Sequence, residues 1–185
     1  MSSPGGGGGG RGGGPGRVLS IQSHTVRGHV GNKSAVLPLQ VLGRDVDAIN
    51  SVQLCAHTQY PSFKGQVLAG SDLDVLADGL DENGLLGDYS HVLTGYIGSK
   101  SFLESVATCV KRAKERRKER GESALCYVCD PVLGDEGHMY VPTELVGAYR
   151  DNLIPLADVL TPNQFEVELL VRIYFLMRIH VHTHA

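Results

Sequence analysis

Tyr127-Val-Cys-Asp-Pro-Val-Leu-Gly-Asp135 is the stretch of sequence that most constrains the fold. It continues an apolar run that starts at Leu125 and has the length and composition of a buried strand. The run ends at Asp130-Pro131, a dipeptide common in turns. A buried strand that delivers carboxylates into a turn is typical of an open α/β sheet, where ligands gather at the carboxyl ends of the strands.

Strand and helix patterns alternate on both sides of this stretch. Short apolar runs predict strands at 17–23, 46–50, 91–94, 125–129 and 157–160. Helical spacing predicts helices at 33–42, 71–80, 99–120, 142–149 and 163–171. Ser71 is the expected N-cap of the second helix, and Ser99 or Ser101 that of the third. This alternation favours βαβ units, so we expect a three-layer α/β fold: a mainly parallel sheet with helices on both faces.

Composition and charge exclude several classes of protein. Hydrophobic residues make up 42% of the 185 residues and charged residues 20%, the balance of a soluble globular protein. The net charge of -3 gives no general attraction to nucleic acid or to a membrane surface. No apolar run reaches the roughly 20 residues that cross a bilayer, and no secretory signal pattern is present. We expect a cytosolic protein in which the Gly-rich residues 1–16 form a disordered tail.

Two local patterns have structural interpretations that compete with functional ones. Cys126 and Cys129 form a C-x-x-C, but positions i and i+3 of a strand face opposite sides of the sheet, so we expect buried, reduced thiols rather than a metal or redox site. The run Lys111–Arg120 is basic, yet glutamates are mixed with the cations and no aromatic residue is interleaved. A solvated helix face is therefore favoured over nucleic-acid binding.

Carboxylates are the most informative side chains at the predicted strand ends. Asp130 alone is more often a turn residue than a ligand of a metal or phosphate. Because Asp135 and Glu166 follow neighbouring strands, the three carboxylates together favour the ligand interpretation. Hard oxygen ligands of this kind suit Mg²⁺, which binds through few carboxylates together with substrate phosphates, as phosphoryl transfer requires. There is no G-x-x-x-x-G-K-[ST] and no strand-linked G-x-G-x-x-G, which excludes a P-loop kinase and disfavours a dinucleotide oxidoreductase.

Many blocks of the sequence resemble one family, the pyridoxal kinases of the animal type, which have a ribokinase-like fold. The resemblance runs collinearly from Arg17 to Leu170. It is carried by Ser20-Ile-Gln-Ser-His24, Arg27-Gly-His-Val-Gly-Asn32, Pro38-Leu-Gln-Val-Leu-Gly43, Asn50-Ser-Val-Gln53, His57-Thr58, Lys64-Gly-Gln-Val-Leu68, Leu93-Thr-Gly-Tyr96, Tyr127–Asp135, Met139-Tyr-Val-Pro142 and Leu160-Thr-Pro-Asn-Gln-Phe-Glu166. It implies ATP-dependent phosphorylation of the 5′-hydroxyl of pyridoxal, pyridoxine or pyridoxamine, in vitamin B6 salvage, by a cytosolic homodimer.

The resemblance also implies a role for individual residues. Ser23 would hydrogen-bond the pyridine ring, and Thr58 would lie beside the substrate in a mobile loop. The ring pocket would be lined by Val30, Val52 and Tyr96. Asp130 and Asn163 would lie near the ATP phosphates. Asp135 and Glu166 would support Mg²⁺, and Thr161 would bind an activating monovalent cation, K⁺ or Na⁺.

Three departures from the family pattern affect these expectations. Gln59 stands where the animal enzymes usually carry Gly, and the loop after Asp135 is shorter than theirs. After Leu170 the sequence no longer matches the family, so residues 17–170 are expected to form the N-terminal part of the kinase domain and 171–185 a divergent tail. The Gly-Thr-Gly-Asp segment that supplies the family's catalytic base is absent, so no catalytic residue is assigned and no useful turnover is expected from the 185 residues alone.

Two other functions remain open at this stage. The chain could be a non-catalytic module that binds vitamin B6 or dimerises with a complete enzyme. It could also belong to a related sugar or hydroxymethylpyrimidine kinase, although Ser20–His24 and Leu93–Tyr96 favour pyridoxal.

Overall fold

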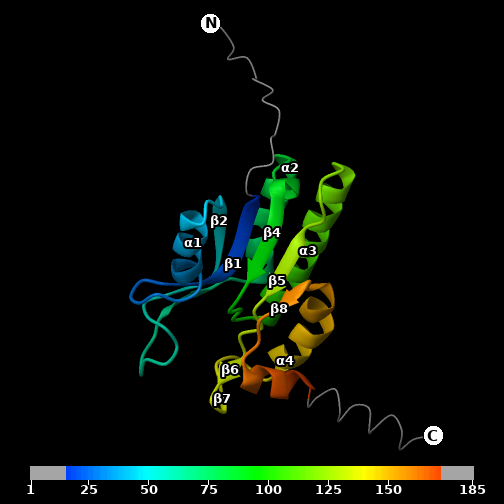
Figure 1. Cartoon of the computed structure of the whole chain (residues 1–185). Coiled ribbons are helices and arrows are strands. Elements are labelled where there is room, and N and C mark those ends of the chain that lie inside the picture. Colours follow the sequence, from blue (N-terminus) through cyan, green and yellow to red (C-terminus); the bar gives the residue numbers. More distant parts are fainter. Residues whose placement is uncertain (1–15, 172–185) are drawn as a thin grey trace, which may run out of the picture.

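The computed structural model describes residues 16–171, and the predicted tails at 1–16 and 171–185 lie almost wholly outside them. A six-stranded sheet forms the centre, in the spatial order β3-β2-β1-β4-β5-β8 (Figure 1). Its strands are β1 (Arg17–Thr25), β2 (Val46–Leu54), β3 (Gly65–Val67), β4 (Tyr89–Thr94), β5 (Cys126–Cys129) and β8 (Val159–Leu160). All neighbouring strands pair in parallel except β3, which is antiparallel to β2. The predicted mainly parallel sheet is therefore confirmed.

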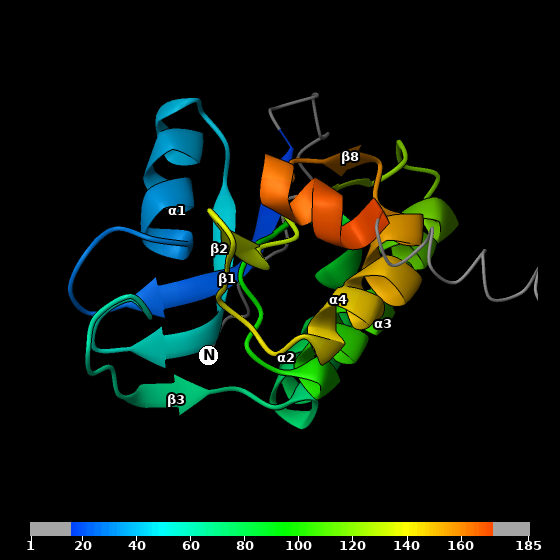
Figure 2. The same cartoon turned by 90° about the horizontal axis from the view of Figure 1, so that it is seen from below.

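Helices cover both faces of the sheet. They are α1 (Asn32–Val41), α2 (Gly70–Glu82), α3 (Lys100–Glu119), α4 (Glu144–Ala148) and a helix at 164–171. Viewed from below, α1 lies on one side of the strands, and α2, α3 and α4 lie on the other (Figure 2). A short hairpin of β6 (Gly134–Asp135) and β7 (His138–Met139) projects beyond the sheet.

Most predicted elements are present, and the errors have local causes. Ser99 caps α3 as expected, since its hydroxyl accepts a hydrogen bond from the Phe102 backbone N–H at 3.3 Å. The prediction of Ser71 as the cap of α2 was wrong, because the helix starts at Gly70 and the Asp72 carboxylate accepts from the Ala69 N–H at 2.8 Å. β3 was not predicted, because an edge strand of three residues is too short to show a period.

The predicted helix at 142–149 is only partly correct. Its regular turns are confined to α4, and the chain continues as a π-helical turn (Tyr149–Leu153) and a 3₁₀ turn (Ile154–Leu156). The Tyr149 side chain is fully buried, and its hydroxyl donates to the Gly95 carbonyl at 3.0 Å. This bond joins the segment to the loop that follows β4, so the irregular turn holds one side of the strand ends in place.

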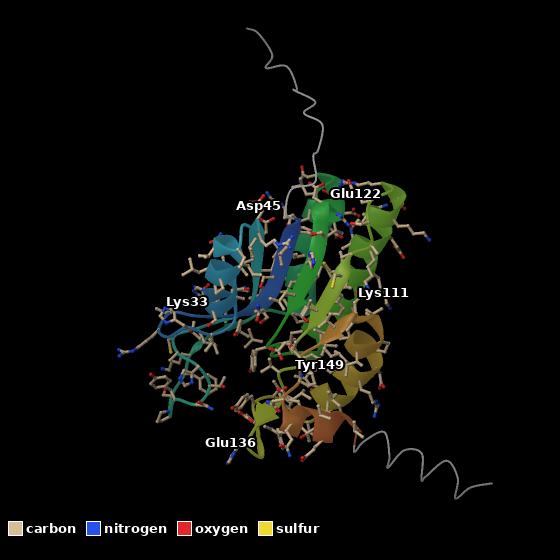
Figure 3. The ribbon with its side chains drawn as sticks, in the orientation of Figure 1. Lys33, Asp45, Lys111, Glu122, Glu136 and Tyr149 are labelled. Atoms are coloured by element: carbon tan, nitrogen blue, oxygen red, sulfur yellow. The ribbon has the colours of Figure 1, made fainter. Side chains whose placement is uncertain are left out.

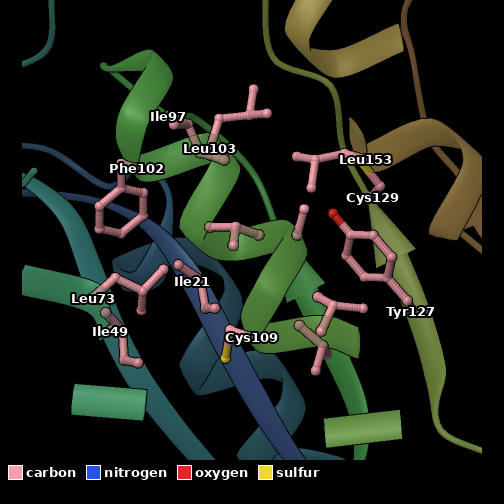
Figure 4. Packing of buried hydrophobic residues seen from close by; sticks show 14 of the residues in the cluster. Ile21, Ile49, Leu73, Ile97, Phe102, Leu103, Cys109, Tyr127, Cys129 and Leu153 are labelled. Atoms are coloured by element: carbon pink, nitrogen blue, oxygen red, sulfur yellow. The ribbon is translucent and has the colours of Figure 1, made fainter. Parts of the chain in front are cut away.

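The main hydrophobic cluster lies between the sheet and α2 and α3. Figure 4 shows Ile21 and Ile49 from the sheet near Phe102 and Leu103 of the helical layer, with Tyr127 of β5 at the other side. Cys109 and Cys129 are buried free thiols, and Cys126 is a partly buried one. Burial raises the pKa of Cys109 to about 11, so this thiol is protonated and acts as a small apolar group.

On the α1 face, Asn32 connects three elements through buried hydrogen bonds. Its amide nitrogen donates to the Ile49 carbonyl at 2.9 Å and to the Asn50 Oδ1 at 2.8 Å. Its Oδ1 accepts from the Ser20 hydroxyl at 2.8 Å. Because each polar atom of this buried amide is paired, Asn32 fixes the start of α1 against β1 and β2.

The basic run on α3 forms ion pairs with neighbouring elements. Arg116 binds Asp81 of α2 through both carboxylate oxygens, at 2.7 and 3.0 Å, and Arg112 binds Asp81 at 2.9 Å. Arg120 pairs with Asp88 at 2.6 Å. The Asp81 pairs hold α3 against α2, and the Arg120 pair joins the end of α3 to the turn that carries Asp88, so these basic side chains have structural partners.

The α2–α3 ion pairs predict a defined acid sensitivity. Hydrogen bonds from Arg116 and then Arg112 lower the pKa of Asp81 to about 2 from 3.8. Because this pKa is depressed in the folded chain, the stabilisation is present above about pH 4 and is lost as the pH falls toward 2. Asp81→Asn should therefore lower the free energy of unfolding by about 1 kcal/mol at pH 6, a small value because the arginines are solvated, and by about a third of that at pH 2.5.

Urea unfolding at the two pH values measures this difference. Asp74→Asn, at an exposed position of the same helix, is the matched control and should change neither value. An Asp81→Asn effect of equal size at both pH values would contradict a charge-dependent role for the carboxylate.

Candidate active site

The carboxyl ends of β1, β2, β4 and β5 lie at one end of the molecule, with the loop at 55–64 and the β6–β7 hairpin (Figures 1 and 2). Figure 3 shows Glu136 at the tip of this hairpin, at the end of the molecule opposite to Asp45 and Glu122. This is the end at which open α/β sheets bind their ligands.

A cavity of about 330 Å³ opens at this end, within the usual volume range of small-molecule sites. We call it the ring cavity. Its walls include six of the residues predicted from the sequence, namely Ser23, Val30, Val52, Thr58, Tyr96 and Asp130. They come from four separate parts of the chain, so the fold brings together what the sequence separates by more than a hundred positions.

The backbone at Gly31 determines where Ser23 can lie. Gly31 has φ +52, a left-handed conformation that favours glycine, and it precedes the first turn of α1. A Cβ at this position would overlap both the carbonyl and the hydroxyl oxygen of Ser23. The glycine therefore allows the turn to pass directly over Ser23 at the edge of the ring cavity.

Several polar groups of the ring cavity have no protein partner. Within residues 16–171, no hydrogen bond is formed by the hydroxyls of Ser23, Thr25 and Thr58 or by the Asp130 carboxylate. Burial, followed by the charge of Glu166, raises the pKa of Asp130 to about 6. Partly buried polar groups without partners are costly unless a ligand or water satisfies them, which is typical of a binding site.

Tyr96 forms an apolar wall of the same cavity. Its backbone carbonyl accepts a 2.6 Å hydrogen bond from the Ser51 hydroxyl, which fixes the chain after β4 against β2. Burial raises the pKa of the Tyr96 phenol, so the ring carries no charge at neutral pH. A neutral aromatic wall suits a flat, uncharged ring as ligand.

A second cavity, of about 710 Å³, adjoins the first and shares Thr58, Gln59, Tyr96 and Tyr140 with it. We call it the outer cavity. It is lined by the acidic residues Asp135 and Glu136 together with His138. The Gln59 side-chain amide donates to the Tyr140 hydroxyl at 3.1 Å, so the loop after β2 contacts the segment after β7 at the boundary of the two cavities.

Glu166 is the most constrained carboxylate of this region. Its side chain is buried, one oxygen accepts from the Leu133 N–H at 2.9 Å, and the other accepts from the Asn163 N–H at 2.9 Å. Asn163 in turn accepts from the Glu166 N–H at 2.9 Å and donates to the Gly134 carbonyl at 2.8 Å. The start of helix 164–171 is thus fastened to the loop that carries Asp130 and Asp135.

These residues fit a magnesium–triphosphate ligand only in part. Asp130 has an unpaired carboxylate, and Asp135 is exposed with one oxygen occupied by the Glu136 N–H at 2.9 Å. Both Glu166 oxygens are already occupied, so its carboxylate has little capacity for direct ligation. Within residues 16–171 no three His, Cys, Asp or Glu side chains form a metal-binding group.

Thr161 lies apart from the residues of the ring cavity. It is exposed, and its backbone N–H donates to the Cys129 carbonyl at 3.2 Å, just beyond β8. The structure thus gathers the other predicted residues into three groups: the ring cavity, Asp135 in the outer cavity, and the Asn163–Glu166 pair behind the connecting loop.

Three residues that line the ring cavity, Thr25, Gln59 and Tyr140, were given no binding role from the sequence. Thr25 follows Ser23 by two positions, and the period of a strand could have indicated that both face one site. Gln59 and Tyr140 meet across 81 positions of sequence, and no local pattern signals such a contact.

The six-stranded, mainly parallel sheet with helices on both faces is the three-layer α/β fold that the ribokinase-like resemblance implies. A family model described as phosphomethylpyrimidine kinase matches residues 83–182, more than half of the chain. Pyridoxal kinase from Arabidopsis thaliana is 61% identical over 155 residues, and pyridoxal kinase from Homo sapiens is 52% identical over 158. The chain belongs to the pyridoxal kinase family.

The solved structures agree with this assignment. Pyridoxal kinase from Leishmania donovani in complex with ADP and pyridoxamine is 46% identical, with a TM-score of 0.80, over 83% of this chain and 53% of that one. The Arabidopsis and human matches cover 84% and 83% of this chain but 48% and 49% of the relatives. The chain therefore spans about half the length of the curated relatives it matches, and the plant relative is more similar to it than the human one.

No helix within residues 16–171 combines the length and the apolar character that a membrane span requires.

Proposed function

We propose that the ring cavity binds a vitamin B6 alcohol and that the kinase to which this chain contributes transfers the γ-phosphoryl group of ATP to its 5′-hydroxyl. The observation that carries the proposal is the convergence of Ser23, Thr58 and Asp130, all without protein partners, on one cavity with an aromatic wall. The names of the relatives supply the substrate class.

In this proposal the ring cavity holds the heteroaromatic ring. The Ser23 hydroxyl bonds the pyridine ring, Val30, Val52 and Tyr96 contact its faces and edge, and Thr58 lies beside the alcohol. A hydroxyl can donate and accept, so Ser23 can pair with the ring nitrogen or with a ring substituent. Apolar walls with few polar groups are the usual composition of such a site.

The outer cavity is assigned to the phosphate side. Asp130, in the wall of the adjoining ring cavity, and Asn163, behind the connecting loop, would lie near the ATP phosphates, and Asp135 in the outer cavity would hold Mg²⁺. Bound Mg²⁺ would neutralise charge on the transferring group. Glu166 acts by fixing the connecting loop, and Thr161 contributes to a site for a monovalent cation. We also infer a cytosolic homodimer, as the family resemblance implies.

Ligand binding by the 185-residue chain tests the substrate half of this proposal. Titration with pyridoxal should saturate, and Ser23→Ala should weaken the affinity about 5- to 30-fold through loss of one hydrogen bond. Ser34→Ala, an exposed serine on α1, is the matched control and should bind as the unaltered chain does. Equal affinity of the Ser23→Ala variant, or no saturable binding by a folded chain, would refute the assignment.

A hydroxymethylpyrimidine alcohol is the second candidate ligand, because the matching family model is described as phosphomethylpyrimidine kinase. The same titration with that alcohol separates the two: tighter binding of the pyrimidine than of pyridoxal would favour it. ATP consumption with pyridoxal distinguishes a complete enzyme from a non-catalytic vitamin-binding module, since only the former releases ADP.

A further inference from the structure

Thr25 carries the one buried side-chain polar atom within residues 16–171 that has no hydrogen-bond partner. Its exposed fraction is 0%, and its Oγ1 contacts no donor or acceptor of the protein. Burial of an unpaired hydroxyl is unfavourable, and native proteins keep few such groups. The unpaired hydroxyl of Thr25 therefore indicates a hydrogen-bond partner that is not part of the protein.

The surroundings of Thr25 indicate where that partner lies. Thr25 ends β1, two positions after Ser23, and both residues line the ring cavity. Its backbone is held in the sheet opposite Leu54, so the side chain cannot turn to solvent without disrupting the pairing. Gly28, in the loop beyond β1, lies close to the hydroxyl, because a Cβ there would come within 4.0 Å of the Thr25 Oγ1.

We propose that Thr25 is a specificity-determining residue whose hydroxyl hydrogen-bonds a polar substituent of the ring bound in this cavity. The inference rests on the proposed function, because the ligand is the B6 alcohol assigned to the ring cavity. Ser23 and Thr25 are two residues apart on one strand, about 7 Å along it, so they contact different atoms of the ligand. A hydroxyl serves equally as donor or acceptor, which lets it pair with an aldehyde, a hydroxyl or an amine substituent.

Thr25→Val is the direct test, because valine keeps the shape of threonine and removes the hydroxyl. Titration with pyridoxal, pyridoxine and pyridoxamine should show at least a fivefold loss of affinity for one or more vitamers, and an unequal loss across the three. Thr25→Ser should restore the affinities to within about twofold. Thr108→Val, on the exposed side of α3, is the matched control and should bind all three as the unaltered chain does.

The outcomes separate this inference from the proposed function. If the unaltered chain binds no vitamer while folded, the proposed function fails. If it binds and Thr25→Val binds all three with unchanged affinity, the partner of Thr25 is a buried water molecule and the inference is overturned. A thermal midpoint of Thr25→Val equal to or above that of the unaltered chain excludes misfolding as the cause of weaker binding.

Discussion

Replacing Glu166 with alanine is expected to lower the free energy of unfolding by about 3 kcal/mol, the largest single effect among the site residues. The substitution leaves the N–H groups of Leu133 and Asn163 without their acceptors in a buried region, and each unsatisfied donor costs about 1 to 3 kcal/mol. It also frees the loop at 130–134 from helix 164–171. Urea unfolding followed by circular dichroism measures the change.

Two further variants make this prediction specific. Glu166→Gln keeps one acceptor oxygen and places an amide donor against the other N–H, so an intermediate loss is expected. Glu168→Ala, two positions later and exposed, should change the unfolding free energy by no more than about 0.5 kcal/mol. A Glu166→Ala value as small as that of the control would mean that this carboxylate is free for a metal ion instead of occupied by the backbone.

Replacing Asp130 with asparagine is expected to stabilise the chain at neutral pH. The pKa of Asp130 is raised to about 6 from 3.8, chiefly by burial, so the folded chain binds this proton more tightly than the unfolded chain does. Stability from this group is greatest below about pH 4 and falls as the pH rises through 6. Asparagine carries no charge and so removes this loss of stability. We expect a gain of about 1 to 2 kcal/mol in the free energy of unfolding at neutral pH, a value kept small because the side chain is partly exposed to solvent.

The pH profile distinguishes this cause from a general effect. In buffer with EDTA, the unfolding free energy of Asp130→Asn should exceed that of the unaltered chain at pH 7.5 and not at pH 4. Asp74→Asn should follow the unaltered chain at both. An Asp130→Asn profile that runs parallel to that of the unaltered chain would contradict a raised pKa at this position.

Glu166 and Asp130 therefore differ in what the protein gains from them. The Glu166 carboxylate accepts hydrogen bonds from the backbone and stabilises the loop. The Asp130 carboxylate has no protein partner and lowers the stability of the folded chain at neutral pH. A residue that lowers stability and faces a cavity is typical of a functional position, where activity is retained at the expense of stability.

The arrangement of strands and helices could be predicted because each element carries its own pattern. The run Leu125–Cys129 is apolar throughout, as is usual for a strand inside a parallel sheet, and Ser99 provides a local cap for α3. Tertiary contacts determine the two helix boundaries that were predicted wrongly. Gly70 packs against Ser101 and starts α2 earlier than expected, and the buried Tyr149 shapes the irregular turn after α4.

The candidate site could be predicted in part. Asp130 follows directly from a strand end, because parallel strands bring these ends to one edge, whereas Ser23 and Thr58 were predicted through the family resemblance. The contact between Gln59 and Tyr140, the orphan hydroxyl of Thr25 and the occupied oxygens of Glu166 depend on side-chain geometry between distant segments. No spacing in the sequence encodes whether a carboxylate faces a ligand or two backbone N–H groups.

Mapping the position at which pyridoxal binds is the most direct test of the assignment of the ring cavity. Amide chemical shifts of the isotope-labelled 185-residue chain, recorded during a pyridoxal titration, should saturate and be largest around Ser23, Thr58 and Asp130 at the carboxyl ends of β1, β2 and β5. Changes confined to the α2–α3 surface, or an unchanged spectrum from a folded chain at saturating pyridoxal, would contradict the assignment of the ring cavity.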